Sequence, residues 1–241
     1  MLSIEDQMLA LRDPKQVANL SRFFKTGTGQ YGEGDRFLGI KVPVTRSIVK
    51  ERWNECDLVQ LQSLVSSPWH EVRLCALLIL VQIFKHHKDK QQLCVDFYLA
   101  NTKYINNWDL VDLSCYEILG NFLLDSGDRS LLYNLALHGA SIWEQRIAIV
   151  SCMQFVRHDQ FDDCLAIADI LLHHPHDLLH KAVGWLLREV GKHDADCLRN
   201  YLRSPARPDT APRYRVMPRT MLRYAIERFD VDERRRWLLK E

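Results

Sequence analysis

The stretch PWHEVRLCALLILVQIF, residues 68–84, repeats its apolar side chains at helical spacing, and weaker versions of it recur along the chain. An amphipathic segment precedes each version, for example QLCVDFYLANT at residues 92–102. The later versions are NWDLVDLSCYEILGNFLL (107–124), IWEQRIAIVSCMQFV (142–156), LLHKAVGWLLREVG (178–191) and MPRTMLRYAIERF (217–229). Their aligned positions lie 39, 34, 35 and 38 residues apart, at Arg73, Asp112, Arg146, Lys181 and Arg219.

A period of this length built from two helices is typical of HEAT-like repeats, which bury their apolar faces by stacking on one another. The pattern predicts an all-α fold, a right-handed α-solenoid whose second helices line one concave groove. We expect one domain over residues 1–241, with N-terminal capping helices at 1–54, central repeats at 55–198 and a basic C-terminal cap at 199–241. Each aligned segment, including 107–124, is expected to be a helix.

One segment lacks the helical spacing of apolar residues. FKTGTGQYGEGDRFLGIKVP, residues 24–43, holds half of the ten glycines and predicts a Gly-rich loop at 26–36. It follows no strand and lacks the G-K-[ST] ending of a phosphate-binding loop, so no nucleotide cofactor is expected. Pro43 suits the first turn of the next helix.

Composition narrows the classes of function. The formal net charge is only +1, but residues 199–241 hold twelve Lys and Arg against six Asp and Glu, so basic charge gathers at the C-terminal end. The seven cysteines form no CxxC pair and fall mostly in apolar helical runs, which favours a reducing, cytoplasmic setting. No apolar run is long enough to span a bilayer, so no membrane partner is expected. The chain is long enough to bury a core alone, which favours a monomer.

The histidine cluster HHPHDLLH, residues 173–180, has no cysteine or carboxylate in a zinc-binding pattern. Pro175 marks it as a turn between helices. We expect neither a metal nor any other cofactor.

Trp108 and Asp112 are the first pair of candidate functional residues. They lie four positions apart, so a helix presents an indole and a carboxylate on one face, whereas Asp109 points elsewhere. Taken alone, the pair also fits a core tryptophan and an aspartate near a helix start. Arg146 and Trp185 lie at or one turn beyond the corresponding positions of the next repeats, so the groove is expected to hold all four side chains. For these two, an ion pair and core packing are the structural alternatives.

The elements FLGIKVP, NNWDLVD, IWEQRIAIV and HKAVGWLLREVG, in this order, resemble the DNA alkylation repair glycosylases of the AlkD-like family over residues 10–230. The resemblance implies a HEAT-like enzyme that hydrolyses the N-glycosidic bond of positively charged N3- and N7-alkylated purines in DNA. It implies that Asp112 is catalytic, that Trp108 and Trp185 contact the lesion, and that Arg146 contacts the DNA backbone. An N-terminal aromatic contact of the family has no assigned counterpart; the candidates are Phe23, Phe24 and Tyr31.

These residue types suit that chemistry. A cationic alkylpurine is already a good leaving group, so the barrier lies in the oxocarbenium character of the sugar, which a buried carboxylate stabilises. Indole faces attract cations more than neutral bases. None of the four residues is a lysine that could form a Schiff base. We therefore expect a monofunctional enzyme, which releases a base such as 3-methyladenine or 7-methylguanine from DNA and leaves an abasic site.

The C-terminal arginines extend the expected interface to double-stranded DNA. Arg219 and Arg223 lie four positions apart on one helical face and are expected to bind the DNA backbone, although a solubilising cap is the alternative. Two other functions stay open: a non-catalytic HEAT-repeat protein that binds unusual DNA structures, and a protein–protein scaffold.

Overall fold

The chain is helical. In the computed structural model, which describes residues 2–208 and 210–239, helices follow one another from end to end, and the described residues form no strand, only isolated bridges between Arg36 and Trp69 and between Pro205 and Pro212. This confirms the predicted all-α class. The chain divides into two compact units, Met1–Ser114 and Cys115–Glu241, which are described separately below.

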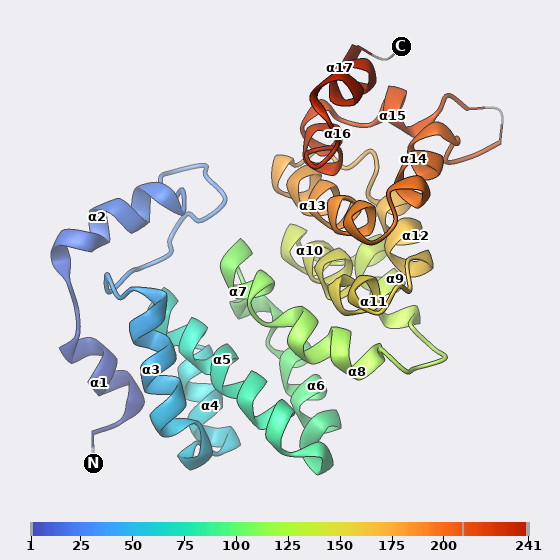
Figure 1. Cartoon of the computed structure of the whole chain (residues 1–241). Helices are drawn as coiled ribbons and strands as arrows, with labels where there is room; N and C mark the ends of the chain where they lie inside the picture. Colours follow the sequence, from blue (N-terminus) through green and yellow to red (C-terminus); the bar gives the residue numbers. More distant parts are fainter. Residues whose placement is uncertain (1, 209, 240–241) are drawn as a thin grey trace. The chain divides into compact units, whose positions relative to one another are not determined.

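The first unit packs its helices around one long central helix, α5. Every α5 residue from His70 to Val81 is buried, because helices α3, α4 and α6 contact α5 on several sides (Figure 1). Pro43 lies in the first turn of α3, as predicted. The helices of this unit are α1 (Ile4–Ala10), α2 (Pro14–Phe23), α3 (Val42–Arg52), α4 (Leu58–Val65), α5 (His70–His86), α6 (Gln91–Ala100) and α7 (Trp108–Asp112), with short 3-10 turns at Trp53–Glu55, Lys88–Lys90 and Thr102–Tyr104.

The segment between the Gly-rich loop and α3 is hydrogen-bonded to the start of α5. The buried carboxylate of Glu71 accepts hydrogen bonds from the backbone N–H groups of Leu38, Gly39 and Ile40 at 2.9, 2.8 and 3.1 Å. Gly39 has a φ of +90°, and a Cβ at this position would lie 2.2 Å from the carbonyl oxygen of Asp13. The FLGIKVP element therefore needs glycine both for its backbone conformation and for this close approach.

The segment 107–124 is not one regular helix, contrary to the sequence-based expectation. Helix α7 ends at Asp112, a turn follows, and the chain then forms a π-helical turn at Tyr116–Gly120 before α8 (Asn121–Leu123). The Ser114 hydroxyl donates to the carbonyl of Leu110 in the last turn of α7. Such local bonds from serine compete with regular helix hydrogen bonds, and π turns are frequent at functional sites.

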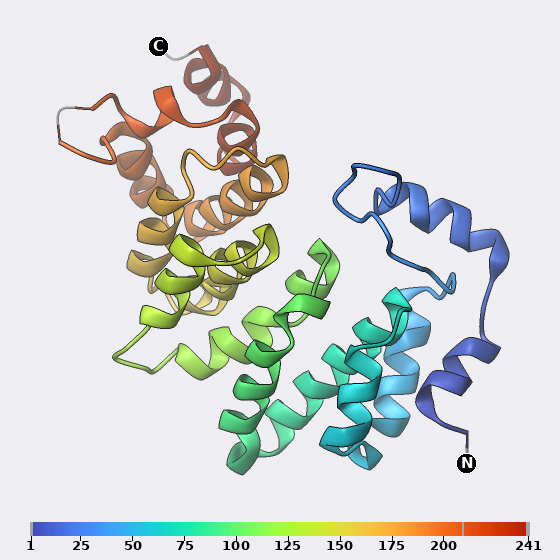
Figure 2. The same cartoon turned by 180° about the vertical axis from the view of Figure 1, so that it is seen from behind.

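The second unit packs its helices around the longest of them, α13 (Asp177–His193). Helix α10 packs on α9, α13 packs on α10, α12 and α14, and α16 packs closely on α13 (Figure 2). A Cβ at Gly184 of α13 would lie 2.5 Å from the carbonyl oxygen of Met221, so this glycine permits the approach of α16. The remaining helices of this unit are α9 (Ser130–His138), α10 (Ile142–Ser151), α11 (Met153–Arg157), α12 (Asp162–Ile170), α13 (Asp177–His193), α14 (Ala195–Arg203), α15 (Arg213–Val216), α16 (Arg219–Ala225) and α17 (Val231–Leu239).

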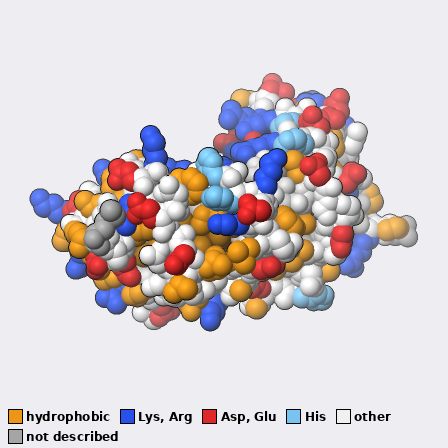
Figure 3. All heavy atoms as spheres, turned by 90° about the horizontal axis from the view of Figure 1, so that it is seen from below, with side chains coloured by type: hydrophobic (Ala, Val, Ile, Leu, Met, Phe, Trp, Pro, Cys, Tyr) orange, Lys and Arg blue, Asp and Glu red, His pale blue; other side chains and the backbone are white. Residues whose placement is uncertain are grey.

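The surface carries charges of both signs (Figure 3), and the core holds most of the cysteines. Side chains of both charges are intermingled on the face in Figure 3. The cysteines of the apolar helical runs are buried, as small hydrophobic residues would be: Cys75, Cys115, Cys152 and Cys164. Among the described helices, none combines the length and the apolar character that crossing a membrane requires.

Candidate functional site

Trp108 and Asp112 are the first and last residues of α7. The side chain of the preceding residue, Asn107, is fully buried and accepts a hydrogen bond from the Trp108 backbone N–H at 2.9 Å, which fixes where the helix begins. Both predicted residues are half-buried. A helix of this length places them one turn apart on the same face, as the spacing predicts.

Two aromatic rings at the C-terminal end of α2, Phe23 and the following residue Phe24, contact Trp108. The ring of Phe24 stacks on the indole at a centroid distance of 5.3 Å and an interplanar angle of 21°, and Phe23 meets it edge-on at 5.7 Å. Phe24 is buried, whereas Phe23 is 61% exposed. The sequence left these two residues and Tyr31 open as N-terminal aromatic candidates; the structure brings Phe23 and Phe24 to Trp108. The feature of the sequence that points to these two residues is the pair of adjacent phenylalanines directly before the Gly-rich loop.

Beneath the rings lies a buried charge network that the sequence did not reveal. His70, the first residue of α5, lies between two carboxylates: Nδ1 is 2.8 Å from Asp35 of the Gly-rich loop, and Nε2 is 2.8 Å from Asp109 of α7. Arg73 pairs with Asp35 as well, and its Nη2 donates to Asn106 Oδ1 at 3.1 Å. The four charged side chains are each at most 8% exposed.

The network sets the charge of its members. Burial alone lowers the pKa of His70, but the carboxylates of Asp109 and Asp35 outweigh it and raise the pKa to about 9. Burial raises the pKa of Asp35, yet its hydrogen bond with His70 and the positive charge of Arg73 bring that pKa below the ordinary value. A pKa of about 9 favours the imidazolium form of His70 at neutral pH, where the ring lies between the carboxylates of Asp35 and Asp109.

The other two predicted residues belong to the second unit. Arg146 lies on α10, is only 5% exposed, and donates from Nη1 to the carbonyl of Leu178 at 2.6 Å. Trp185 lies half-buried on α13, directly after Gly184. Their roles toward DNA stay predictions.

Arg219 and Arg223 are exposed on α16. Arg219 donates from Nη1 to the carbonyl of Leu238 at 3.2 Å.

Arg223 borders a cavity of about 670 Å³ between α13, α16 and α17. Thr220 and Tyr224 line it together with four basic side chains (Lys181, Arg188, Arg223 and Arg234) and two acidic ones (Asp177 and Glu227). One turn separates Trp185 from both Lys181 and Arg188 on α13, so the indole is expected beside this basic lining.

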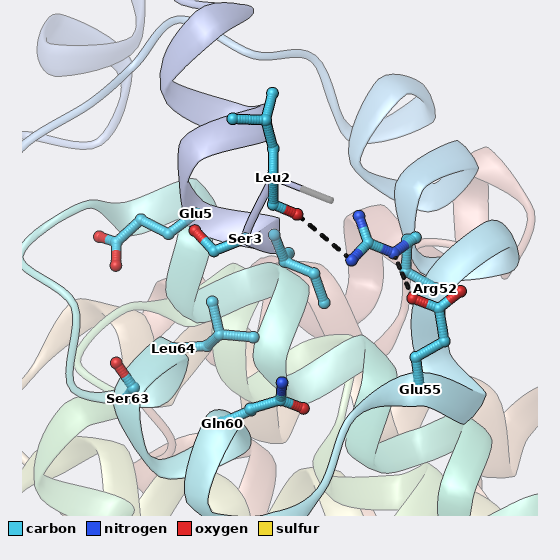
Figure 4. A pocket seen from close by; sticks show the side chains of 9 residues that line it. Leu2, Ser3, Glu5, Arg52, Glu55, Gln60, Ser63 and Leu64 are labelled. Carbon is cyan, nitrogen blue, oxygen red and sulfur yellow. Dashed lines mark hydrogen bonds and ion pairs between the residues drawn. The ribbon is translucent and has the colours of Figure 1, made fainter.

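A further cavity, of about 430 Å³, lies beside the N-terminus of α1. Figure 4 shows Arg52 at its wall, where the guanidinium donates to Glu55 Oε2 at 2.7 Å and to the carbonyl of Leu2 at 3.4 Å. Ser3, Gln60 and Ser63 also line it. None of the predicted site residues borders this cavity.

The first three histidines of the cluster (His173, His174 and His176) lie between α12 and α13, and His180 lies in the first turn of α13, so Pro175 marks a turn between helices, as predicted. Within the described ranges, no group of three or more His, Cys, Asp or Glu side chains is arranged to hold a metal ion.

Comparison with known proteins gives one family. The family model described as "DNA alkylation repair enzyme" matches residues 4–229. A solved structure described as "Predicted DNA alkylation repair enzyme from Enterococcus faecalis" superposes with a TM-score of 0.64 at 16% sequence identity, covering 91% of this chain and 97% of that chain. At this identity the superposition shows a shared fold. No curated protein matches the chain.

Proposed function

The chain belongs to the family of DNA alkylation repair enzymes, and from this premise we propose that it is a DNA glycosylase that removes positively charged N3- or N7-alkylated purines from duplex DNA. The family gives the role in DNA repair and DNA as the partner. The reaction and the base are our proposal, and residues of the first unit support both.

The observation that carries the proposal is the placement of Trp108 and Asp112 on one turn of α7. The helix presents an aromatic ring and a carboxylate side by side, and both are half-buried. Leu110 and Val111 of the same helix are fully buried in the core, whereas Trp108 and Asp112 lie at its half-buried edge.

Asp112 is the proposed catalytic residue. Departure of a cationic purine leaves a neutral base, so protonation of the leaving group contributes little. Positive charge instead develops on the deoxyribose as the C1′–N bond lengthens, and a carboxylate beside C1′ stabilises it and positions the attacking water. The products are the free base and an abasic site.

Trp108 and Phe23 are the proposed contacts to the lesion in this unit. An indole face attracts a cation by roughly 0.5 to 2 kcal/mol, depending on how far water is excluded. Phe24 supports the indole from behind, and the exposed ring of Phe23 extends the aromatic surface. This surface would favour an alkylated, charged base over an unmodified one.

The sequence repeats support a wider proposal. Their period favours a right-handed HEAT-like solenoid with a concave DNA-binding groove, to which Trp185 would contribute a second aromatic contact. Arg146, Arg219 and Arg223 would bind the DNA backbone; the exposure of Arg219 and Arg223 on α16 supports this for these two.

The deciding experiment measures release of free 3-methyladenine and 7-methylguanine from methylated duplex DNA. We expect release by the wild type and at least a hundredfold slower release by Asp112→Asn, in keeping with the loss of a charge-stabilising group. Asp96→Asn, an exposed aspartate on α6, is the matched control and should keep the wild-type rate. No release by the wild type, or equal release by Asp112→Asn, would refute the assignment.

Two outcomes of the same assay separate the neighbouring functions. Strand breakage at the product site only after alkali treatment indicates a monofunctional glycosylase, whereas breakage without alkali indicates lyase activity. Tight, salt-dependent DNA binding with no base release from any lesion would favour the non-catalytic DNA-binding protein instead.

A further inference from the structure

His70 is the best-connected side chain under the candidate site. Both ring nitrogens lie 2.8 Å from carboxylate oxygens, one of Asp35 and one of Asp109, and the side chain is 1% exposed. A neutral imidazole carries one N–H and could donate to only one of them. With an ionised carboxylate on each side, only the doubly protonated ring can donate to both.

The network ties three parts of the chain together. Asp35 belongs to the Gly-rich loop, His70 and Arg73 to α5, and Asp109 to α7. Two carboxylates face two cations, so the buried charges balance. Among the described residues Asp109 Oδ1 has no hydrogen-bond partner, which leaves His70 as the contact that neutralises this carboxylate.

The face of the imidazole takes part as well. The ring stacks on Phe37 at 4.5 Å and lies 4.9 Å from Phe24. Phe24 in turn stacks on Trp108. His70 thus reaches Trp108 by two routes: through the rings, and through the hydrogen bond to the next residue in the chain.

We propose that His70 is a positioning residue for the reaction, which holds the indole of Trp108 and the short helix that carries Asp112 in their working orientation. This inference rests on the proposed glycosylase function. Asp109 then has a role as well. Its contact with His70 anchors α7 to α5. A short helix of this kind has little stability of its own and depends on such tertiary contacts.

The test compares His70→Gln with wild type in single-turnover release of 7-methylguanine at neutral pH. We expect a rate constant at least tenfold lower, with the dissociation constant for DNA changed less than threefold. Leu61→Ala, which removes a buried side chain from α4, is the control for general destabilisation and should keep the wild-type rate while lowering the unfolding temperature. Equal rates for His70→Gln and wild type, or losses that track the unfolding temperature in both variants, would overturn the inference.

A spectroscopic measurement separates this inference from the glycosylase proposal. Protein labelled with 5-fluorotryptophan gives a fluorine signal for Trp108, assigned with Trp108→Phe. We expect this signal to move in His70→Gln but not in Leu61→Ala, and in the wild type to titrate with a midpoint near pH 9. The charged groups that face His70 are Asp35 of the loop and Asp109 of α7.

The outcomes are distinguishable. A Trp108 signal that is the same in His70→Gln and in wild type contradicts the positioning role, whatever the enzyme does. No base release by wild type, together with the expected signal changes, leaves the His70 contact in place and rejects the glycosylase. If His70→Gln does not fold, Asp109→Asn takes its place, because it keeps the size of the side chain and removes only the charge facing the ring.

Discussion

The indole of Trp108 stacks on the ring of Phe24 at a centroid distance of 5.3 Å, so a residue of α7 and the residue that follows α2 form one aromatic surface. Phe24 is buried and Phe23, next to it, is exposed. The inner ring therefore supports the indole, while the outer ring is free to contact a ligand. This division of roles gives a direct test.

Trp108→Ala should slow release of 7-methylguanine about tenfold or more, because the cation–π contact and the support of Phe23 are both lost. Phe23→Ala should slow release only a few fold and leave the unfolding temperature almost unchanged, since an exposed ring contributes little to the core. Trp108→Phe should fall between these variants. Single-turnover rates at saturating enzyme measure all three, and a Trp108→Ala enzyme as fast as wild type would remove the indole from the mechanism.

His70 should make stability depend on pH. Its pKa is raised from 6.5 to about 9 in the folded protein, so the protonated ring stabilises the fold fully below pH 6.5, and this contribution is lost as the pH rises through 9. The shift corresponds to roughly 3 kcal/mol. Urea unfolding of the wild type and of His70→Gln from pH 6 to 10 should give a difference in unfolding free energy that shrinks across this window. A constant difference would mean that the ring does not change its charge there.

The helical class and several boundaries could be predicted from the sequence, because they depend on local patterns. The spacing of apolar residues located α5 and α13, Pro43 located the start of α3, and the glycines located the loop before it. The i and i+4 positions of Trp108 and Asp112 were also readable, since a single helical turn decides them.

What the sequence could not reveal depends on contacts between distant segments. His70 and Asp109 lie 39 residues apart, and Asp35 lies 35 residues before His70. Nothing in the local pattern distinguishes these three network members from ordinary residues of a loop or of the first turn of a helix. The end of α7 at Asp112 was missed for a related reason: the apolar pattern continues through it, whereas the Ser114 hydroxyl and the π turn break the regular backbone.

Gly39→Ala should destabilise the protein more than Gly29→Ala, although both glycines have positive φ. A Cβ at Gly29 meets nothing within 4 Å, so alanine there costs about 1 to 2 kcal/mol of backbone strain. A Cβ at Gly39 would also clash with the Asp13 carbonyl oxygen at 2.2 Å, which adds about 1 to 3 kcal/mol. Chemical denaturation of the two variants measures the difference, and equal losses would show that the loop can move away from α2.

Arg219→Gln and Arg223→Gln should each weaken binding to duplex DNA regardless of its sequence or lesion, and each should reduce the slope of log K against log salt by about 1, the effect of losing one phosphate contact. Arg199→Gln is the control, because ion pairs with Glu233 at 2.8 Å and Asp196 at 2.8 Å already engage that guanidinium. Fluorescence anisotropy with a labelled duplex between 50 and 200 mM salt, about the range over which phosphate contacts dominate, gives the slopes. An unchanged slope in both α16 variants would mean that these arginines serve as a solubilising cap, whereas a reduced slope in only one would assign the phosphate contact to that side chain.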